Sequence, residues 1–430
     1  VSYASEVNNA PYVVTVSAKK PDLSEDEFSV VTSDTRVVAI NRSGNQVNLV
    51  PVGAGSATIT FISNSEPNLT RSITASIAPQ FVQSPTVYNL NGLTQPAVNA
   101  VESQVDGKLR ITFDLPPTLA SAGSIRIYKL SDDSVVDTIK LVDEKLYIGS
   151  DPTRLRTINA PLVEVEGNSL YITPHKTLDY GTSYYVSISP GAITNATIGG
   201  LAFDGLGKAA GWIFTTKPNA PSGTVITVDD DAPADFSTLQ GALNYVMANI
   251  PINTETQIHI KNGIYEEPLL LRNKNNLTIS GESQQGVQIR YKNNNTLNPG
   301  AGGTGTADGA LGGRAVWLIE SVDNLVLEHF TLTNTTLIGE GGQAETIYLN
   351  SDQGRLIGKY ISLSSEQDTI SLKGYNWFYR SLIAGNVDFI WGYSKASLFE
   401  KSEIRSLGRS TGNNNGGYVL QARVEAASDK

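Results

Sequence analysis

Apolar residues recur late in this 430-residue chain at spacings of 20 and then 21 residues, at Leu363, Ile383 and Ile404. A repeat of roughly 20 residues is too short for a globular domain and is typical of one coil of a solenoid. Short runs rich in β-branched residues, separated by turn formers, fill the repeats, and helical periodicity is absent from them. The pattern therefore favours a parallel β-helix over a leucine-rich repeat.

Two aspartates occupy the same position in consecutive repeats. Asp368 lies five residues after Leu363, and Asp388 lies five residues after Ile383. Equivalent positions of neighbouring coils are about 4.8 Å apart, so we expect both carboxylates on one face. Two negative charges this close do not ionise together easily, so the pair can divide into an acid and a nucleophile. By spacing alone, coincidence among 42 acidic residues stays equally open.

One helix is expected ahead of the coils. Ser237-Thr238-Leu239-Gln240 fits a capping box, with Ser237 as the N-cap and Gln240 three residues later. Apolar residues then keep helical spacing to about Ile250, just before Pro251. Such a helix would cover the end of the solenoid, where an open strand edge invites pairing.

The chain before the linker at residues 217–223 is interpreted as two β-sandwiches. Residues 1–80 contain short alternating runs around a Gly53-Ala54-Gly55 turn, and residues 83–217 contain further runs such as Leu109–Phe113. Residues 37–60 resemble a bacterial Ig-like domain of the group 2 type. Residues 178–186 and 212–216 are similar to another bacterial Ig-like family. Neither sandwich gathers convergent polar groups, so we expect spacer or adhesive modules, with carbohydrate binding as the alternative.

The composition excludes several classes of function. The chain has 32 basic and 42 acidic residues and no basic stretch, which argues against nucleic-acid binding because such binding depends on phosphate neutralisation. Without cysteine there are no disulfides, thiolate nucleophiles or cysteine-ligated metals. His175, His259 and His329 lack ligand spacing, so we expect neither a zinc site nor a histidine-based triad. No segment approaches the roughly 18 apolar residues of a membrane span.

Four motifs follow one another in the second half of the chain. They are Gly263-Ile264-Tyr265-Glu266-Glu267, Gly342-Gln343-Ala344, Gln367-Asp368-Thr369 and the eight residues GNVDFIWG at 385–392. In this order they resemble the pectinesterase family over residues 222–430, with Trp391 where the family has Phe. The resemblance implies an all-β protein, in which two Ig-like sandwiches precede a right-handed parallel β-helix with an N-terminal capping helix. It also implies a secreted or cell-surface bacterial enzyme.

The resemblance implies a chemistry as well: hydrolysis of the methyl esters of galacturonate residues in pectin, with release of methanol. Asp388 would be the nucleophile that forms an acyl-enzyme, and Asp368 would protonate the departing methanol and then activate water. Gln343 and Gln367 would donate to the oxyanion. Trp391 and Phe389 would contact the sugar. The implied enzyme is a monomer acting on methyl-esterified homogalacturonan, without metal or cofactor.

Three alternatives remain. A polygalacturonase-like hydrolase would also use paired carboxylates, but it needs no oxyanion donors such as Gln367 beside Asp368. A pectate lyase would need calcium-binding acids and a basic residue, and the sequence gathers no such cluster. Ig-like modules leading into a β-helix would equally suit a non-catalytic cell-surface adhesin.

The family places a Leu-Gly-Arg-Pro-Trp motif several coils after the nucleophile, and its arginine pairs with the nucleophilic carboxylate. Here Leu407-Gly408-Arg409 comes too early and is followed by Ser410. We interpret it as a chance match, and we interpret Arg423 as structural. Residues 222–430 are therefore expected to be a truncated β-helix domain with weak or absent activity.

Overall fold

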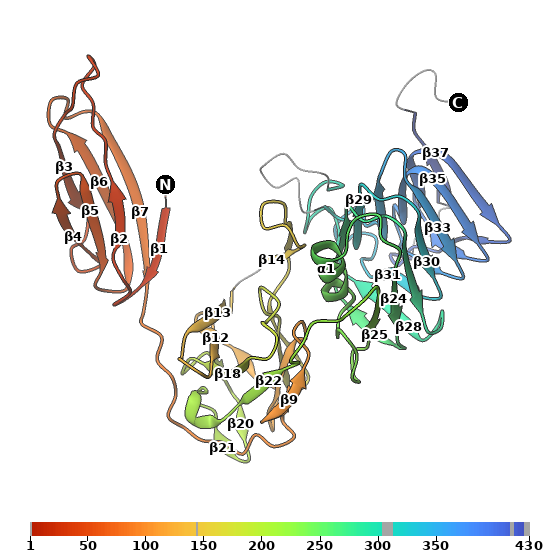
Figure 1. Ribbon diagram of the computed structural model, residues 1–430, viewed down its shortest axis with the longest axis horizontal. Coiled ribbons are helices and arrows are strands. Elements are labelled where there is room, and N and C mark those ends of the chain that lie inside the picture. The colour runs from red at the N-terminus through yellow and green to blue at the C-terminus, as the bar shows by residue number, and fades with distance from the viewer. Residues whose placement is uncertain (1, 143–144, 303–312, 413–416, 425–430) are drawn as a thin grey trace. The chain divides into compact units, whose positions relative to one another are not determined.

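The computed structural model describes residues 2–142, 145–302, 313–412 and 417–424 (Figure 1). Within these ranges the chain consists mainly of strands and contains a single α-helix, which confirms the expected all-β fold. It forms two compact units, residues 1–83 and residues 84–430. No helix in the described ranges is both long and apolar enough to cross a membrane.

The first unit is a sandwich with strand orders β1-β7-β6-β3 and β2-β5-β4 in its two sheets. Its core takes side chains from both sheets, including Leu49 and Ile59, and the expected glycine turn lies between β5 and β6. The strands are β1 (Ser2–Glu6), β2 (Tyr12–Thr15), β3 (Phe28–Thr32), β4 (Val38–Ser43), β5 (Gln46–Pro51), β6 (Gly55–Ser63) and β7 (Thr70–Ala78).

The second unit begins with another sandwich, whose larger sheets have the orders β16-β17-β10-β8 and β13-β12-β18-β22-β9. Three two-stranded pairs accompany them: β11-β19, β14-β15 and β20-β21. Buried aromatic side chains such as Trp212 and Tyr184 fill its core. The elements are β8 (Thr94–Gln95), β9 (Ala100–Ser103), β10 (Leu109–Thr112), β11 (Thr118–Leu119), β12 (Ser124–Lys129), β13 (Val135–Lys140), β14 (Lys145–Ile148), β15 (Arg156–Asn159), β16 (Val163–Glu166), β17 (Ser169–Ile172), β18 (Ser183–Ile188), β19 (Ile193–Thr194), β20 (Thr197–Ile198), β21 (Leu201–Ala202), the 3₁₀ helix η1 (Lys208–Ala210) and β22 (Ile213–Thr216).

The rest of the second unit is a parallel β-helix. One sheet has the order β25-β28-β31-β34-β36-β38, and the strands of the other coil faces join into a sheet of eleven. The elements are β23 (Val225–Val228), α1 (Leu239–Asn249), β24 (Thr256–Ile260), β25 (Gly263–Glu266), β26 (Leu269–Arg272), β27 (Leu277–Gly281), β28 (Val287–Tyr291), β29 (Trp317–Glu320), β30 (Leu325–Glu328), β31 (Thr331–Asn334), β32 (Ile347–Asn350), β33 (Arg355–Lys359), β34 (Ser362–Ser364), β35 (Ile370–Tyr379), β36 (Leu382–Gly385), β37 (Ile390–Glu400), β38 (Glu403–Ser406) and β39 (Leu420–Ala422).

The register of the coils confirms the repeat in the sequence. Leu363 pairs with Ile383, and Ile383 pairs with Ile404, all in parallel strands. The same row continues backwards through Leu332 to Ile289. The members of this row from Ile289 to Ile383 belong to the core of the solenoid, because each coil buries its apolar row against the next. Ile404 lies on β38, the edge strand of this sheet, and is 43% exposed.

Helix α1 begins one residue later than expected. Thr238, not Ser237, is the N-cap, and its hydroxyl accepts a hydrogen bond from the Gly241 amide. Gln240 does not reach back to close a capping box; its side chain instead exchanges two hydrogen bonds with the backbone of Leu270. The shift has a tertiary cause, because buried carboxylates from elsewhere in the fold already satisfy the free amides at the helix start. Asp106 and Glu267 supply them.

Candidate active site

Asp368 and Asp388 occupy equivalent positions on neighbouring coils, as the repeat predicts. Asp368 precedes β35 and Asp388 precedes β37, and both strands start in register through Ile370 and Ile390. Both aspartates have left-handed backbones, with φ of 60° and 47°. Such a conformation is uncommon for residues other than glycine and concentrates at functional sites, where the surrounding structure enforces it. Here the Asp368 amide is fixed by the Val387 carbonyl at 2.9 Å.

Asp368 lies in a nearly closed environment, with 7% of the residue exposed. Burial above all, then the nearby charge of Glu345 and, less strongly, that of Asp388, raise the pKa of Asp368, and the net pKa is about 7. The Arg314 charge and a hydrogen bond from Gln367 act in the opposite direction. A carboxyl group with a pKa near neutrality can both give and take a proton at working pH, as a general acid-base catalyst must.

Arg314 is the cation beside Asp368, and sequence reasoning missed it. Its Nη2 lies 3.5 Å from Oδ2 of Asp368, while its Nε donates to both carboxylate oxygens of Glu345 at 2.9 and 3.0 Å. Its Nη1 donates to the side-chain oxygen of Asn295 at 3.1 Å. Arg314 therefore connects a buried acid, a loop amide and the candidate acid-base catalyst.

Glu345 is completely buried, and this burial raises its pKa, whereas Arg314 lowers it. A buried carboxylate is costly unless it is paired, so Glu345 holds the Arg314 guanidinium in place and depends on it in return. One signal for Glu345 was available in the sequence, since it directly follows Gln343-Ala344. Arg314 had no such signal, because it belongs to no repeat.

Asp388 is half-buried and is held by a different set of groups. Gln421 on β39 donates from Nε2 to Oδ2 of Asp388 at 3.0 Å. Arg423 donates in turn to the Gln421 side-chain oxygen, at 3.1 Å from Nε and 2.7 Å from Nη2. This chain of hydrogen bonds orients Gln421, so that its NH₂ group rather than its oxygen faces the carboxylate. Arg423 therefore helps to orient the Gln421 side chain that contacts Asp388. The predicted structural role of Arg423 did not include this contact.

The two predicted oxyanion glutamines are both half-buried. Gln367 hydrogen-bonds to Asp368 and bridges to Val387 on the next coil. Gln343 is anchored through its backbone carbonyl, which accepts from the Asn295 amide at 3.0 Å. Asn295 thus links the Gln343 segment to Arg314.

The predicted sugar contact of Phe389 is wrong. Its side chain is 0% exposed and belongs to the core of the β-helix. The left-handed backbone of Asp388 turns the following side chain inward, where Phe389 packs tightly under Gly385: a Cβ at Gly385 would lie 2.2 Å from that of Phe389.

Trp391 is 8% exposed, so only a small part of it can contact a ligand. The guanidinium carbons of Arg423 and Arg314 lie over its ring, at 4.8 and 5.8 Å from the centroid. Trp391 therefore contacts both arginines of the site and packs against them, and its predicted sugar contact stays a prediction.

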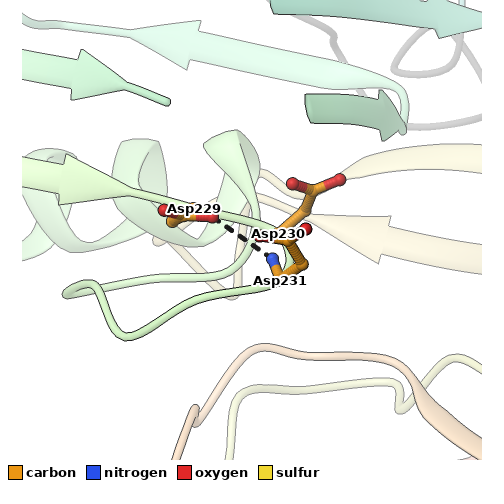
Figure 2. Close-up of side chains that lie close together, drawn as sticks. All are labelled: Asp229, Asp230 and Asp231. Atoms are coloured by element: carbon orange, nitrogen blue, oxygen red, sulfur yellow. Dashed lines mark hydrogen bonds between the residues drawn. The ribbon is translucent and has the colours of Figure 1, made fainter. Parts of the chain in front are cut away.

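One acidic group in the described ranges could in principle hold a cation. The carboxylates of Asp229, Asp230 and Asp231 approach within 4.8 Å of one another (Figure 2). Asp229 accepts hydrogen bonds from the amides of Asp231 and Ala232, and Asp230 accepts one from the Ile264 amide. These bonds close a turn and tie it to β25, which accounts for the cluster without a metal.

One large cavity does not coincide with the aspartate pair. It measures about 1100 Å³ and lies between the second sandwich and the start of the β-helix. Tyr180, Tyr245 and Glu267 are among its lining residues, whereas neither Asp368 nor Asp388 is. The residue chemistry, not the cavity volume, identifies the candidate site.

Comparison with known proteins divides the second unit into two parts. Residues 225–427 match the model of the Pectinesterase family, and residues 82–216 match the model of a bacterial Ig-like domain. Curated relatives are the probable pectinesterases A of Aspergillus flavus and Aspergillus oryzae, each 31% identical over 219 residues. These alignments cover 50% of this chain and 60% of each relative, so the chain spans about three fifths of their length.

Two solved structures are also similar to this chain. The pectin methylesterase from Aspergillus niger is 25% identical, with a TM-score of 0.39, and the match covers 49% of this chain and 64% of that one. The pectin methylesterase from Erwinia chrysanthemi is also 25% identical, with a TM-score of 0.38 and coverage of 48% and 62%.

Proposed function

We propose that the β-helix hydrolyses methyl esters of galacturonate residues in pectin and releases methanol. The observation that carries this proposal is the pair Asp368 and Asp388, in register on neighbouring coils. Arg314 lies beside Asp368, and Arg423 orients the Gln421 side chain that donates to Asp388. The family match over residues 225–427 supports it. The domain boundaries near residue 80 and at residues 217–223, and a location outside the cell, are part of the same proposal.

In the first half of the reaction, an Asp388 carboxylate oxygen attacks the ester carbonyl carbon. The carbonyl electrons move onto its oxygen and return as the bond to the methoxy group breaks. Methanol leaves with the proton of Asp368, and an acyl-enzyme anhydride remains on Asp388. Gln421 keeps Asp388 oriented for this attack through its 3.0 Å hydrogen bond.

In the second half, the Asp368 carboxylate removes a proton from water. The hydroxide attacks the acyl carbon of the galacturonate, Asp388 departs as a carboxylate, and Asp368 is left protonated for the next cycle. In this proposal Gln343 and Gln367 donate to the oxyanion of each step. One such donor typically contributes about 3 kcal/mol to transition-state stabilisation.

A glycoside hydrolase is the second candidate, because paired carboxylates also cleave glycosidic bonds. The two candidate oxyanion donors, Gln343 and Gln367, favour acyl transfer, since only that reaction develops an oxyanion. Of the two, Gln367 hydrogen-bonds to Asp368. A non-catalytic adhesin would have no use for an acid-base group with a pKa near 7.

The purified chain is expected to release methanol slowly from methylated homogalacturonan, without shortening the polymer. Methanol is quantified directly, and polymer length is followed by size-exclusion chromatography. The Asp388→Asn variant provides the background rate. Methanol release no faster than this background would contradict the esterase proposal, and polymer shortening would favour the glycosidase.

The pH dependence of kcat/KM should have an alkaline limb near pH 7. Acylation needs protonated Asp368, whose pKa is raised to about 7, so kcat/KM falls as the pH rises through that value. The measurement is the initial rate of methanol release from short methylated oligomers, at low substrate concentration across the pH range. A flat profile between about pH 6 and pH 9 would remove Asp368 from the role of general acid.

A further inference from the structure

The β14–β15 hairpin of the second sandwich is joined to the β-helix by a buried arginine. Arg156 is 0% exposed and donates to four carbonyl groups of the β-helix. Nη1 donates to Leu269 at 2.6 Å and Val316 at 3.0 Å, while Nη2 donates to Gly313 at 3.1 Å and to Ala315. A guanidinium fits this task because its five N–H donors are fixed in a planar fork.

Three of these four carbonyls surround Arg314 in the sequence, since they belong to Gly313, Ala315 and Val316. The Val316 amide, on the same short segment, donates to the Glu345 carbonyl at 2.9 Å. The backbone on either side of Arg314 is therefore hydrogen-bonded to Arg156 and also to the coil that contains Glu345. The Arg314 side chain reaches from this segment to Glu345 and Asp368.

A second contact of the same hairpin fixes the neighbouring loop. The Asn159 amide donates to the Asn298 side chain at 2.8 Å, and the Asn159 side chain donates to the Leu297 carbonyl at 2.7 Å. This loop also contains Asn295, which accepts from Arg314 and donates to Gln343. The hairpin thus touches both segments that surround the Arg314 side chain.

Apolar contacts complete the attachment. Ile148, Ile158 and Ala160 of the second sandwich form one buried cluster with Leu270 and Leu318 of the β-helix. Burial lowers the pKa of Arg156, so the fold bears a desolvation cost to keep this cation between the two domains. Removing the guanidinium would take one donor from each of these four carbonyl groups. Gly313 and Ala315 would keep the side-chain amide of Asn293, and Val316 would keep the Leu269 amide, so the segment would be held less firmly and not released.

We propose that Arg156 is a positioning residue of the esterase site: the second sandwich holds the backbone of Arg314 so that its guanidinium stays on Glu345 and Asp368. This inference rests on the proposed function of the site. It replaces the spacer role expected for the second sandwich with a part in assembling the acid-base catalyst.

The test compares Arg156→Lys in the full chain with Arg126→Lys as the matched control. Arg126 lies on β12, between β13 and β18 of the same sandwich. Loss of the fork should lower kcat roughly 10- to 100-fold, with a smaller change in KM, because Arg314 moves relative to Asp368. The control should keep the kcat of the unchanged chain. Thermal unfolding of each variant identifies any general loss of folding.

Two further readouts separate positioning from a general structural role. Arg314→Lys and Arg156→Lys should both displace the alkaline limb of the pH profile to higher pH, because the Arg314 charge lowers the pKa of Asp368. The double variant should be no slower than Arg314→Lys alone. Independent, multiplicative losses in kcat would overturn the inference, as would an unshifted pH profile in Arg156→Lys.

Hydrogen exchange of the Val316 and Trp317 amides gives a result that does not depend on activity. These amides donate to carbonyls of Glu345 and Thr346, so they should exchange faster in Arg156→Lys than in the unchanged chain or the control. Unchanged exchange would overturn the inference. If the unchanged chain released no methanol, the esterase proposal would fail, while the exchange rates would still decide whether Arg156 fixes the Arg314 segment.

Discussion

Replacing Asp388 with asparagine is expected to lower kcat for methyl-ester hydrolysis by roughly 10⁴-fold or more, because an amide cannot replace a carboxylate nucleophile. The fold should persist, since Asp388 is half-buried and its partner Gln421 has both a donor and an acceptor with which to face an amide. The measurement is methanol release at saturating substrate, together with thermal unfolding of the same preparation. A folded variant with near-normal kcat would exclude Asp388 as the nucleophile.

Asp352→Asn is the matched control for this substitution. Asp352 pairs with Lys373 at 2.9 Å, and 62% of its side chain is exposed, so the same chemical change is made where the charge is well solvated. Methanol release by this variant should equal that of the unchanged chain. A comparable loss in both variants would point to a general effect of the altered charge, and not to nucleophilic catalysis.

The Asp368→Asn variant is expected to lose roughly 10²- to 10⁴-fold in kcat/KM on methyl esters, the usual contribution of a positioned general acid. The alkaline limb near pH 7 should disappear with it, because the group whose pKa is raised to about 7 is gone. Rates are measured over the same pH range as for the unchanged chain. Retention of the limb would assign it to another group.

The leaving group separates the two aspartates further. A galacturonate ester of an acidic phenol needs no proton to depart, so it should restore much of the acylation rate of Asp368→Asn. The same ester should restore nothing in Asp388→Asn, which lacks the nucleophile. An equal loss on methyl and aryl esters would contradict the division of roles between the two carboxylates.

The coil register could be deduced from the sequence because a solenoid repeats a local pattern. The spacing from Leu363 to Ile383 and Ile404 sets which residues stack, and the pairings in the structure follow it. Asp368 and Asp388 inherit their register from this row, so their proximity needed no knowledge of distant contacts. The position of α1 was predicted for a similar reason, since helical spacing is also local.

The two predictions that were wrong, the N-cap residue of α1 and the sugar contact of Phe389, depend on contacts between remote segments or on local backbone geometry. The N-cap moved from Ser237 to Thr238 where Asp106, 132 residues earlier, accepts from the helix start. Phe389 turned into the core because Asp388 adopts a left-handed backbone that a strand pattern does not reveal.

By itself, the sequence determined the β-helix, its register and the two stacked aspartates, because each follows from a repeat whose neighbours in space are one coil apart in the chain. Only the tertiary structure decided what surrounds them. Arg314 reaches Asp368 across 54 residues, and Arg156 grips the Arg314 segment from another domain, across 157 residues to Gly313. Neither contact could be deduced from a repeat in the sequence. A buried acceptor needs a donor, and the tertiary fold decides which distant residue supplies it.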